Sequence, residues 1–138
     1  MEREIDELIA ACSRKIATFL QTLKETGARS GEAWRLEWTD IDTEHNVITI
    51  NKPEKHGAPR QCKISGKLAA MLNSIPKRNK RVFGKSTLAT LRKNFMQQRQ
   101  RTAFNLQNPR IKRITFHTLR HWKATTEYHK TKDILHVK

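Results

Sequence analysis

Residues 116–121 read Phe-His-Thr-Leu-Arg-His, and residues 26–32, far upstream, read Thr-Gly-Ala-Arg-Ser-Gly-Glu. Between them lies a basic turn at residues 53–60, Pro-Glu-Lys-His-Gly-Ala-Pro-Arg. Arginine can donate two parallel hydrogen bonds to phosphate oxygens, and lysine or histidine can transfer a proton. The three segments together therefore predict a site that holds a phosphodiester while it is attacked.

The composition is strongly basic for a chain of this size. The 138 residues are enough for one domain with its own core. They include 28 lysines and arginines against 13 acids, which gives a net charge of +15 and a pI of about 10.4. A surplus that large favours a polyanion partner. Ribosomal and membrane-surface proteins share the trait, so charge alone indicates a class of partner and not a function.

Several other classes of site have no sequence signal. No apolar run approaches the length of a membrane span, and the first residues do not form a signal peptide. Cys12 and Cys62 lack metal-ligand spacing and are expected to be two structural thiols in a reducing compartment. No His, Cys, Asp or Glu cluster has metal spacing and no glycine-rich phosphate loop occurs. We therefore expect no metal and no nucleotide cofactor.

The pattern of apolar residues predicts mostly helices. The stripe from Ile5 to Leu23 predicts one long helix or two abutting ones, ended by Gly27. Ser30 is expected to be the N-cap of a short helix that reaches about Trp38. Further helices are expected at 66–75, ended by Pro76; after a cap at Ser86; at about 115–129; and in a short stretch from about 131 or 132.

Two short segments read as strands. Residues 47–51 and 60–64 alternate apolar and polar side chains, and the Pro- and Gly-containing segment 53–59 joins them as a hairpin. The aromatic residues fit core positions better than a base-stacking platform; they are Trp34, Trp38, Phe19, Phe83 and Phe95. The predicted fold class is therefore α+β, mostly helical with one small antiparallel sheet.

Residues 26–42 and residues 116–126 resemble two motifs of the tyrosine recombinase (phage integrase) family, and the resemblance covers nearly the whole chain. It implies the fold of that family's catalytic core. It also implies that Arg29 and Arg120 clamp the phosphate and that His117 assists proton transfer. Glu32 and His121 are expected to orient these residues without contacting the phosphate themselves.

The same resemblance assigns a lysine on the hairpin as the general acid for the leaving 5′ oxygen. Lys55 matches that place best, with Lys52 and Lys63 as weaker candidates. Basic residues beside the site are expected to bind DNA: Lys52, Arg60, Lys112 and Arg113.

Each motif also has a simpler reading in isolation. Arg29 can be a surface arginine that pairs with Glu32, and Lys55 can be part of a solvated turn. A histidine three residues before an arginine, as in His117 and Arg120, occurs by chance in any basic helix.

The family's nucleophilic tyrosine has no match. The only tyrosine is Tyr128, eight residues after Arg120 in the same predicted helix and too early for that role. We therefore expect residues 1–138 to be a partial catalytic domain without the N-terminal DNA-clamp domain and the C-terminal tyrosine segment. Whether another protomer supplies the tyrosine, and whether the shortening is natural, stays open.

The resemblance implies a site-specific recombinase that cuts and rejoins duplex DNA through a 3′-phosphotyrosyl intermediate, with no metal or cofactor. Its partners would be double-stranded DNA and other recombinase protomers, in the cytoplasm of a prokaryote or of a virus-infected host. This chain is expected to bind DNA but not to cleave it alone. The alternatives are a non-enzymatic DNA-binding relic or regulatory module of the same fold, and an unrelated basic RNA-binding protein.

Overall fold

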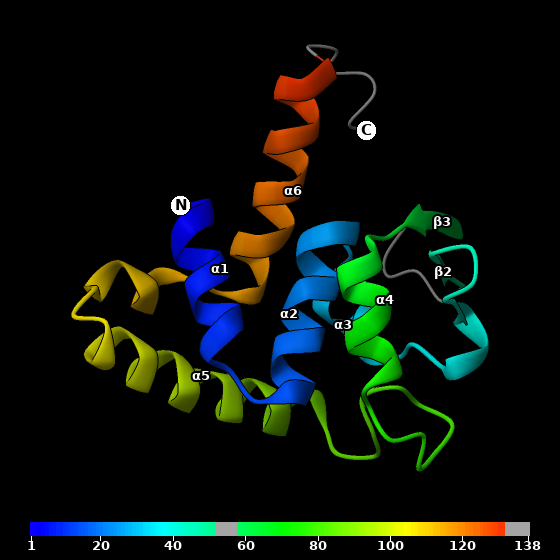
Figure 1. The fold of residues 1–138 in the computed structure, drawn as a ribbon, viewed down its shortest axis with the longest axis horizontal. Coiled ribbons are helices and arrows are strands. Elements are labelled where there is room, and N and C mark those ends of the chain that lie inside the picture. Colours follow the sequence, from blue (N-terminus) through cyan, green and yellow to red (C-terminus); the bar gives the residue numbers. More distant parts are fainter. Residues whose placement is uncertain (52–57, 132–138) are drawn as a thin grey trace.

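The computed structural model describes residues 1–51 and 58–131. In Figure 1, α2 lies in the middle of the helices, α5 runs across one end, and the small sheet lies at the opposite edge from the η2 turn. The class is therefore α+β with one small antiparallel sheet, as predicted. The elements in chain order are α1 (Glu2–Ala11), α2 (Arg14–Thr26), α3 (Ser30–Trp34), the 3₁₀ turn η1 (Trp38–Asp40), β1 (Ile41–Asp42), β2 (Val47–Ile50), β3 (Arg60–Lys63), α4 (Gly66–Asn73), α5 (Leu88–Asn105), the 3₁₀ turn η2 (Pro109–Arg113) and α6 (Phe116–Thr131).

The opening apolar stripe forms two helices, α1 and α2. The backbone is extended at the junction, and the N–H of Ser13 donates to the side-chain oxygen of Gln98 over 2.8 Å. Gly27 ends α2 in the left-handed region with φ of 69°, and its N–H donates to the carbonyl of Leu23. A Cβ at Gly27 would lie 3.0 Å from Cγ of Lys123, so the end of α2 touches α6 through bare backbone.

The short helix after Gly27 differs from the prediction at both ends. Its N-cap is Arg29 instead of Ser30, because the Glu32 carboxylate accepts the backbone N–H of Arg29 over 2.8 Å. The helix ends at Trp34 and does not reach Trp38.

A pairing with a distant segment explains the early end of α3. The carbonyl of Leu36 accepts the N–H of Val82, and the N–H of Trp38 donates to the carbonyl of Lys80, each over 3.1 Å. The backbone at residues 36–38 is therefore drawn into an extended pairing with residues 80–82. A helix through Trp38 would forfeit these hydrogen bonds.

The sheet has the order β1-β2-β3 and is antiparallel throughout. In the β2–β3 hairpin Val47 lies opposite Lys63 and Ile50 lies opposite Arg60. Alternate β2 residues, Ile48 and Ile50, are buried and face the helices. The hairpin is as predicted, whereas β1 was not predicted because two residues are too short to show an alternating pattern.

The remaining helices are at the predicted places with small shifts. The hydroxyl of Ser65 accepts the N–H of Leu68 and begins α4. Thr87, and not the predicted Ser86, caps α5, because its hydroxyl accepts the N–H of Thr90. The helix predicted after Thr131 lies outside the described residues.

An aromatic cluster joins α2, α5 and the start of α6. Phe19 on α2 contacts Phe83 edge-on at a ring-centroid distance of 5.0 Å. Phe116, the first residue of α6, packs against Phe19 at 5.1 Å and against Phe95 of α5 at 4.9 Å. Phe19, Phe83 and Phe95 are at most 2% exposed, so their predicted core positions are confirmed. The cluster fixes where α6 begins relative to α2 and α5.

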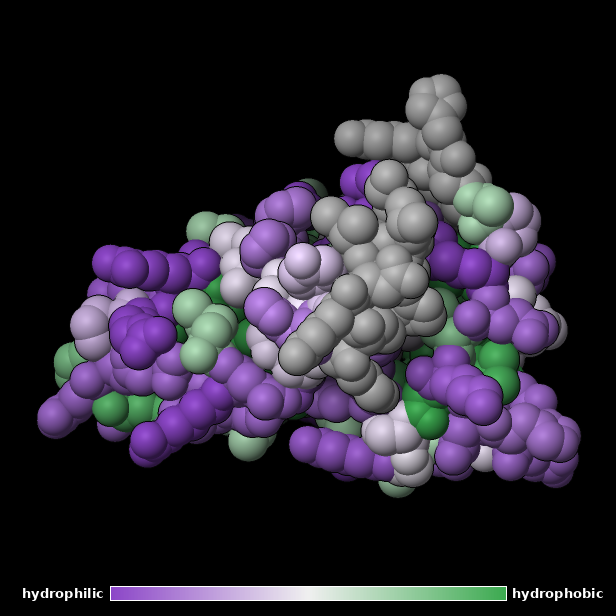
Figure 2. Space-filling view, turned by 90° about the horizontal axis from the view of Figure 1, so that it is seen from above, coloured by the Kyte–Doolittle hydropathy of each residue, from purple (hydrophilic) through white to green (hydrophobic). Residues whose placement is uncertain are grey.

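One face of the molecule is mainly polar. Figure 2 shows one face on which hydrophilic side chains predominate and hydrophobic areas are small and separate. Within residues 1–51 and 58–131, no helix is long and apolar enough to cross a membrane. Cys12 and Cys62 are unpaired and half-buried, and burial raises the pKa of both thiols, that of Cys12 to about 11. Both thiols are therefore held in the protonated, unreactive form at neutral pH.

Candidate functional site

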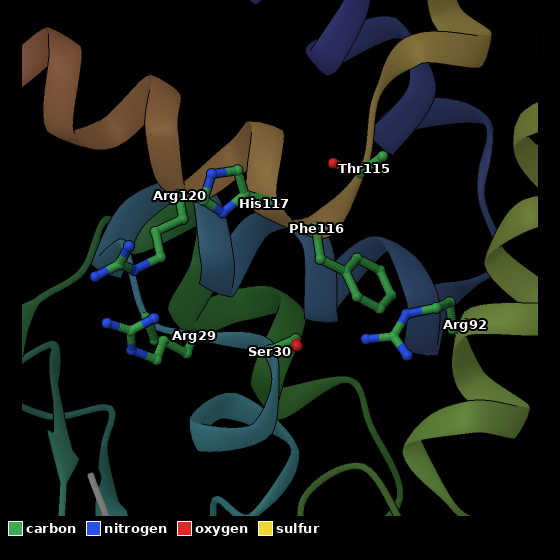
Figure 3. Close-up of a pocket in the computed structure, with 8 residues that line it drawn as sticks. Arg29, Ser30, Arg92, Thr115, Phe116, His117 and Arg120 are labelled. Carbon is green, nitrogen blue, oxygen red and sulfur yellow. The ribbon is translucent and has the colours of Figure 1, made fainter. Parts of the chain in front are cut away.

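A cavity of about 340 Å³ lies where the loop after α2, the N-terminal half of α5 and the start of α6 meet (Figure 3). Its charged and titratable lining residues are Arg29, Arg92, His117 and Arg120. Ala28, Ser30, Thr115 and Phe116 complete the described lining. None of the described lining residues is a carboxylate, so the cavity suits an anion. Its volume also suits a phosphate with part of its attached groups.

The start of α6 places two of these residues on one helix face. The hydroxyl of Thr115 accepts the N–H of Thr118, which caps the helix where the sequence predicts its start. His117 and Arg120 follow at a spacing of three and both line the cavity. Because they lie in the first turns, the positive end of the α6 dipole also favours an anion there.

Arg29 and Arg120 come from opposite ends of the sequence and meet at the cavity. Figure 3 shows their guanidinium groups on the same side, one from each wall. The Nε atom of Arg120 is buried, and it has no hydrogen-bond partner among the described residues. A buried donor without a partner costs about 1–3 kcal/mol. An anion that accepted a hydrogen bond from this atom would remove that cost.

Glu32 lies behind Arg29 and is 4% exposed. One carboxylate oxygen accepts the backbone N–H of Arg29 over 2.8 Å and Nη2 of Arg60 over 2.9 Å. The hydrogen bond from Arg60 to Glu32 raises the pKa of the Arg60 guanidinium. One carboxylate therefore ties the first residue of β3 to the backbone that carries Arg29.

Replacing Glu32 with alanine is expected to lower the free energy of unfolding by about 1–3 kcal/mol, because the charged hydrogen bonds to Arg29 and Arg60 are lost. Urea denaturation of the variant measures the change. Glu44, an exposed turn residue, provides the control, since Glu44→Ala is expected to change stability by no more than about 0.5 kcal/mol. Equal stability of the two variants would contradict a bracing role for Glu32.

None of the other predicted site residues belongs to the described lining of the cavity. Lys52 and Lys55 lie outside the described residues. Lys112 and Arg113 are exposed on η2 and do not line the cavity. Lys112 instead lines a neighbouring hollow beside α5.

Arg60 and His121 also lie outside the cavity lining. Arg60 is half-exposed with its guanidinium against Glu32. His121 is exposed on α6, and its supporting role stays a prediction.

Arg92 lines the cavity and was not predicted from the sequence. Its guanidinium lies 5.5 Å from the ring centroid of Phe116, on the side of the cavity away from Arg29 and Arg120 (Figure 3). The only signal in the sequence is that residues 55–126 contain 18 lysines and arginines and no acid. That signal does not single out Arg92 from its basic neighbours.

Tyr128 is not among the described residues that line the cavity. It lies eight residues beyond Arg120, which corresponds to roughly 12 Å along the helix axis, and its side chain is 42% exposed. Its described ring contact is with His129. Among residues 1–51 and 58–131, no group of His, Cys, Asp or Glu could hold a metal ion.

The chain matches the model of the phage integrase family over residues 1–137. Among solved structures it is similar to XerA recombinase, with a TM-score of 0.79 and 20% identity, covering 99% of this chain and 51% of that one. The catalytic domain of bacteriophage HP1 integrase matches with a TM-score of 0.70 and 27% identity, covering 100% of this chain and 76% of that domain.

A third similar structure is the XerH site-specific recombinase bound to its difH substrate in a pre-cleavage complex. Its TM-score is 0.71 and its identity 23%, covering 98% of this chain and 44% of that one. Among curated proteins, none matches this chain in sequence. The chain spans about half the length of the XerA recombinase, because the match covers 51% of that chain.

Proposed function

Because the chain belongs to the phage integrase family and has the fold of a tyrosine recombinase catalytic domain, we propose that it binds duplex DNA and clamps one backbone phosphate in the Arg29–Arg120 cavity. The observation that carries the proposal is that Arg29, from one part of the chain, and His117 and Arg120, from another, line one cavity whose described lining includes no carboxylate. A buried, unpartnered donor on Arg120 supports an anionic ligand there.

In the proposed reaction of the full-length recombinase, a tyrosine attacks the phosphorus of the bound phosphate. A 3′-phosphotyrosyl bond forms, and the 5′ oxygen leaves with a proton. Arg29 and Arg120 neutralise the charge that builds up on the phosphoryl oxygens, where fixed donors help most. Lys55 is the proposed proton donor to the 5′ oxygen, and His117 assists proton transfer. The proposed additional DNA contacts are Lys52, Arg60, Lys112 and Arg113. Glu32 braces Arg29, and His121 is proposed only as a support on the same helix.

The same proposal has three further parts. The full-length recombinase would recombine DNA, would act together with other protomers, and would be located in the cytoplasm of a prokaryote or an infected host. In this proposal the attacking tyrosine is not Tyr128, which is not among the described lining residues of the cavity. The position of Tyr128 on α6 favours a second candidate function for this chain by itself, namely a DNA-binding module that does not cleave.

We expect the chain to bind duplex DNA with an affinity that depends steeply on salt. With about six phosphate contacts, the affinity should fall roughly 10³-fold between 50 and 200 mM salt, because each contact releases counterions. Fluorescence anisotropy with a labelled duplex measures this dependence. Binding that is insensitive to salt would contradict the proposal.

On a nicked suicide duplex, the chain alone is expected to give no covalent protein–DNA adduct, because Tyr128 does not reach the cavity. Denaturing gel electrophoresis detects such an adduct. An adduct that persists in Tyr128→Phe would contradict the assignment of a tyrosine nucleophile, and an adduct lost in that variant would contradict the position assigned to Tyr128.

A further inference from the structure

A hollow of about 420 Å³ lies where α1, α2, the start of α4 and α6 meet. It shares no described lining residue with the phosphate cavity. Its volume is within the usual range of sites for small organic ligands. Four of its lining residues are lysines and two are acids. We call this hollow, which is lined in part by Gln21, Lys63, Lys67 and Trp122, the α2–α6 pocket.

The two acids of the α2–α6 pocket are already paired within the fold. Asp6 accepts a hydrogen bond from Nζ of Lys24 over 2.7 Å. The Glu25 carboxylate accepts the backbone N–H and the hydroxyl of Ser65, each over 2.7 Å. The negative charges are therefore used to join α1 to α2 and α2 to the start of α4.

Two of the lysines keep their charge available. Lys123 donates to Glu127 over 2.7 Å. Lys63 and Lys67 are exposed, and neither has an ion-pair partner among residues 1–51 and 58–131. The charge left over at the pocket is therefore positive and lies on these two ammonium groups. Lysine is a common ligand of phosphate groups.

Gln21 gives the pocket a polar atom without a partner. The residue is 6% exposed, and its Nε2 donates to Glu25 over 2.7 Å. Because a carboxylate only accepts hydrogen bonds, this contact settles which end of the amide is the oxygen. That oxygen, Oε1, is buried and accepts no hydrogen bond from the described residues. A ligand N–H placed against it would remove the cost of leaving it unpaired.

Trp122 adds a flat apolar surface to the pocket. Its side chain is half-buried, and Nζ of Lys24 lies 4.8 Å from its ring centroid. Planar rings pair favourably with such an indole, and nucleobases do so whatever their sequence identity. The pocket thus combines a pair of cations, an unpaired acceptor and an aromatic ring.

We propose that the α2–α6 pocket binds a free nucleotide with an amino-bearing base, such as adenosine 5′-monophosphate. The phosphate contacts Lys63 and Lys67, the base lies against the indole of Trp122, and the amino group donates to Oε1 of Gln21. The sequence has no glycine-rich phosphate loop, so lysine side chains hold the phosphate instead of backbone N–H groups. The proposal goes beyond the DNA clamp and does not depend on it.

The position of Lys63 fits this role. Lys63 was a weaker candidate for the proton donor to the leaving 5′ oxygen. It lines the α2–α6 pocket and is not among the described lining residues of the phosphate cavity.

Titration calorimetry of residues 1–138 with adenosine 5′-monophosphate tests the proposal. Adenosine and ribose 5-phosphate are each expected to bind roughly tenfold or more weakly, because each lacks one of the groups that the pocket holds. Purine riboside 5′-monophosphate lacks only the amino group. It should bind more weakly than adenosine 5′-monophosphate to the parent and equally well to Gln21→Met. No binding of adenosine 5′-monophosphate, or equal binding of adenosine, would overturn the proposal.

A pair of double variants tests the phosphate contacts. Lys63→Gln with Lys67→Gln is expected to weaken binding of adenosine 5′-monophosphate roughly tenfold or more. Arg78→Gln with Lys85→Gln removes the same charge at exposed positions outside the described lining of the pocket, and it should bind as the parent does. Equal affinity of the two double variants would contradict the assignment.

Tryptophan fluorescence locates the base. Adenosine 5′-monophosphate is expected to quench the emission of the parent. In Trp122→Leu the quenching should be lost, although Trp34 and Trp38 remain. Quenching that persists in this variant would place the base elsewhere and overturn the proposal.

The phosphate cavity also suits an anion, so Arg29→Gln with Arg120→Gln separates the two sites. If this variant loses binding of adenosine 5′-monophosphate while Lys63→Gln with Lys67→Gln keeps it, the nucleotide occupies the phosphate cavity and the pocket proposal is wrong, whereas the proposed function stands. If duplex DNA displaces the nucleotide from the parent, the pocket belongs to the DNA-binding surface, and that result also overturns the proposal. Duplex binding that stays unchanged in the Lys63 and Lys67 variant, together with lost nucleotide binding, is the expected outcome.

Discussion

Replacing Arg120 with alanine is expected to slow covalent DNA cleavage about 10²–10³-fold in a longer version of the chain that carries a tyrosine able to reach the cavity. Loss of a fixed donor to the charged transition state typically costs about that factor. The Nε atom of Arg120 is buried without a partner among the described residues, so this donor is available to an anion in the cavity. Adduct formation on a nicked suicide duplex, followed over time, gives the rate.

The affinity for DNA should change much less than the rate, because many other cations contribute to ground-state binding. Arg120→Lys keeps the charge but loses the planar pair of donors. It is therefore expected to bind DNA as the parent does and still to cleave slowly. Arg29→Ala should behave like Arg120→Ala, whereas Arg78→Ala should cleave at the parent rate. If Arg29→Ala and Arg120→Ala both cleave at the parent rate, the assignment of the clamp is wrong.

Phe19→Ala is expected to lower the free energy of unfolding by about 3–5 kcal/mol, the usual cost of removing a fully buried phenylalanine. Phe19 is 0% exposed and contacts both Phe83 and Phe116. Because Phe116 begins α6, the cavity left by the substitution also loosens the helix that carries His117 and Arg120. Urea denaturation and the salt dependence of DNA binding measure the two effects.

The exposed Phe104 provides the matched control for stability. It is 80% exposed, so Phe104→Ala is expected to change the free energy of unfolding by no more than about 0.5 kcal/mol. If Phe19→Ala is too unstable to study, Phe19→Leu keeps most of the volume and should show a smaller loss. Equal stability of Phe19→Ala and the parent would contradict the central role of the aromatic cluster.

The sequence predicted those parts of the fold that local patterns determine. Gly27 ends α2 because glycine readily adopts a positive φ, and Thr115 begins α6 because its hydroxyl caps the first turn. The early end of α3 could not be predicted, since it depends on hydrogen bonds between residues 36–38 and the distant residues 80–82. Periodicity carries no information about such a pairing.

The candidate site shows the same division. Arg29, His117 and Arg120 stand in recognisable motifs, and the structure brings them to one cavity. Arg92 stands in no motif, and only the packing of α5 against α6 places it there. Arg60 was predicted as a DNA contact, which stays a prediction, and its pairing with Glu32 was not predicted. Sequence identifies the chemistry of a side chain, whereas its partner depends on which elements pack together.

The contact between Gly27 and Lys123 joins the two segments that carry the cavity arginines. Arg29 lies two positions after Gly27, and Arg120 lies three positions before Lys123. A side chain at position 27 would bring its Cβ within 3.0 Å of the Lys123 side chain and would have to adopt the positive φ of 69°, so a substitution there is strained. The spacing of Arg29 and Arg120 is therefore expected to depend on an uncharged position that is not among the described lining residues of the cavity.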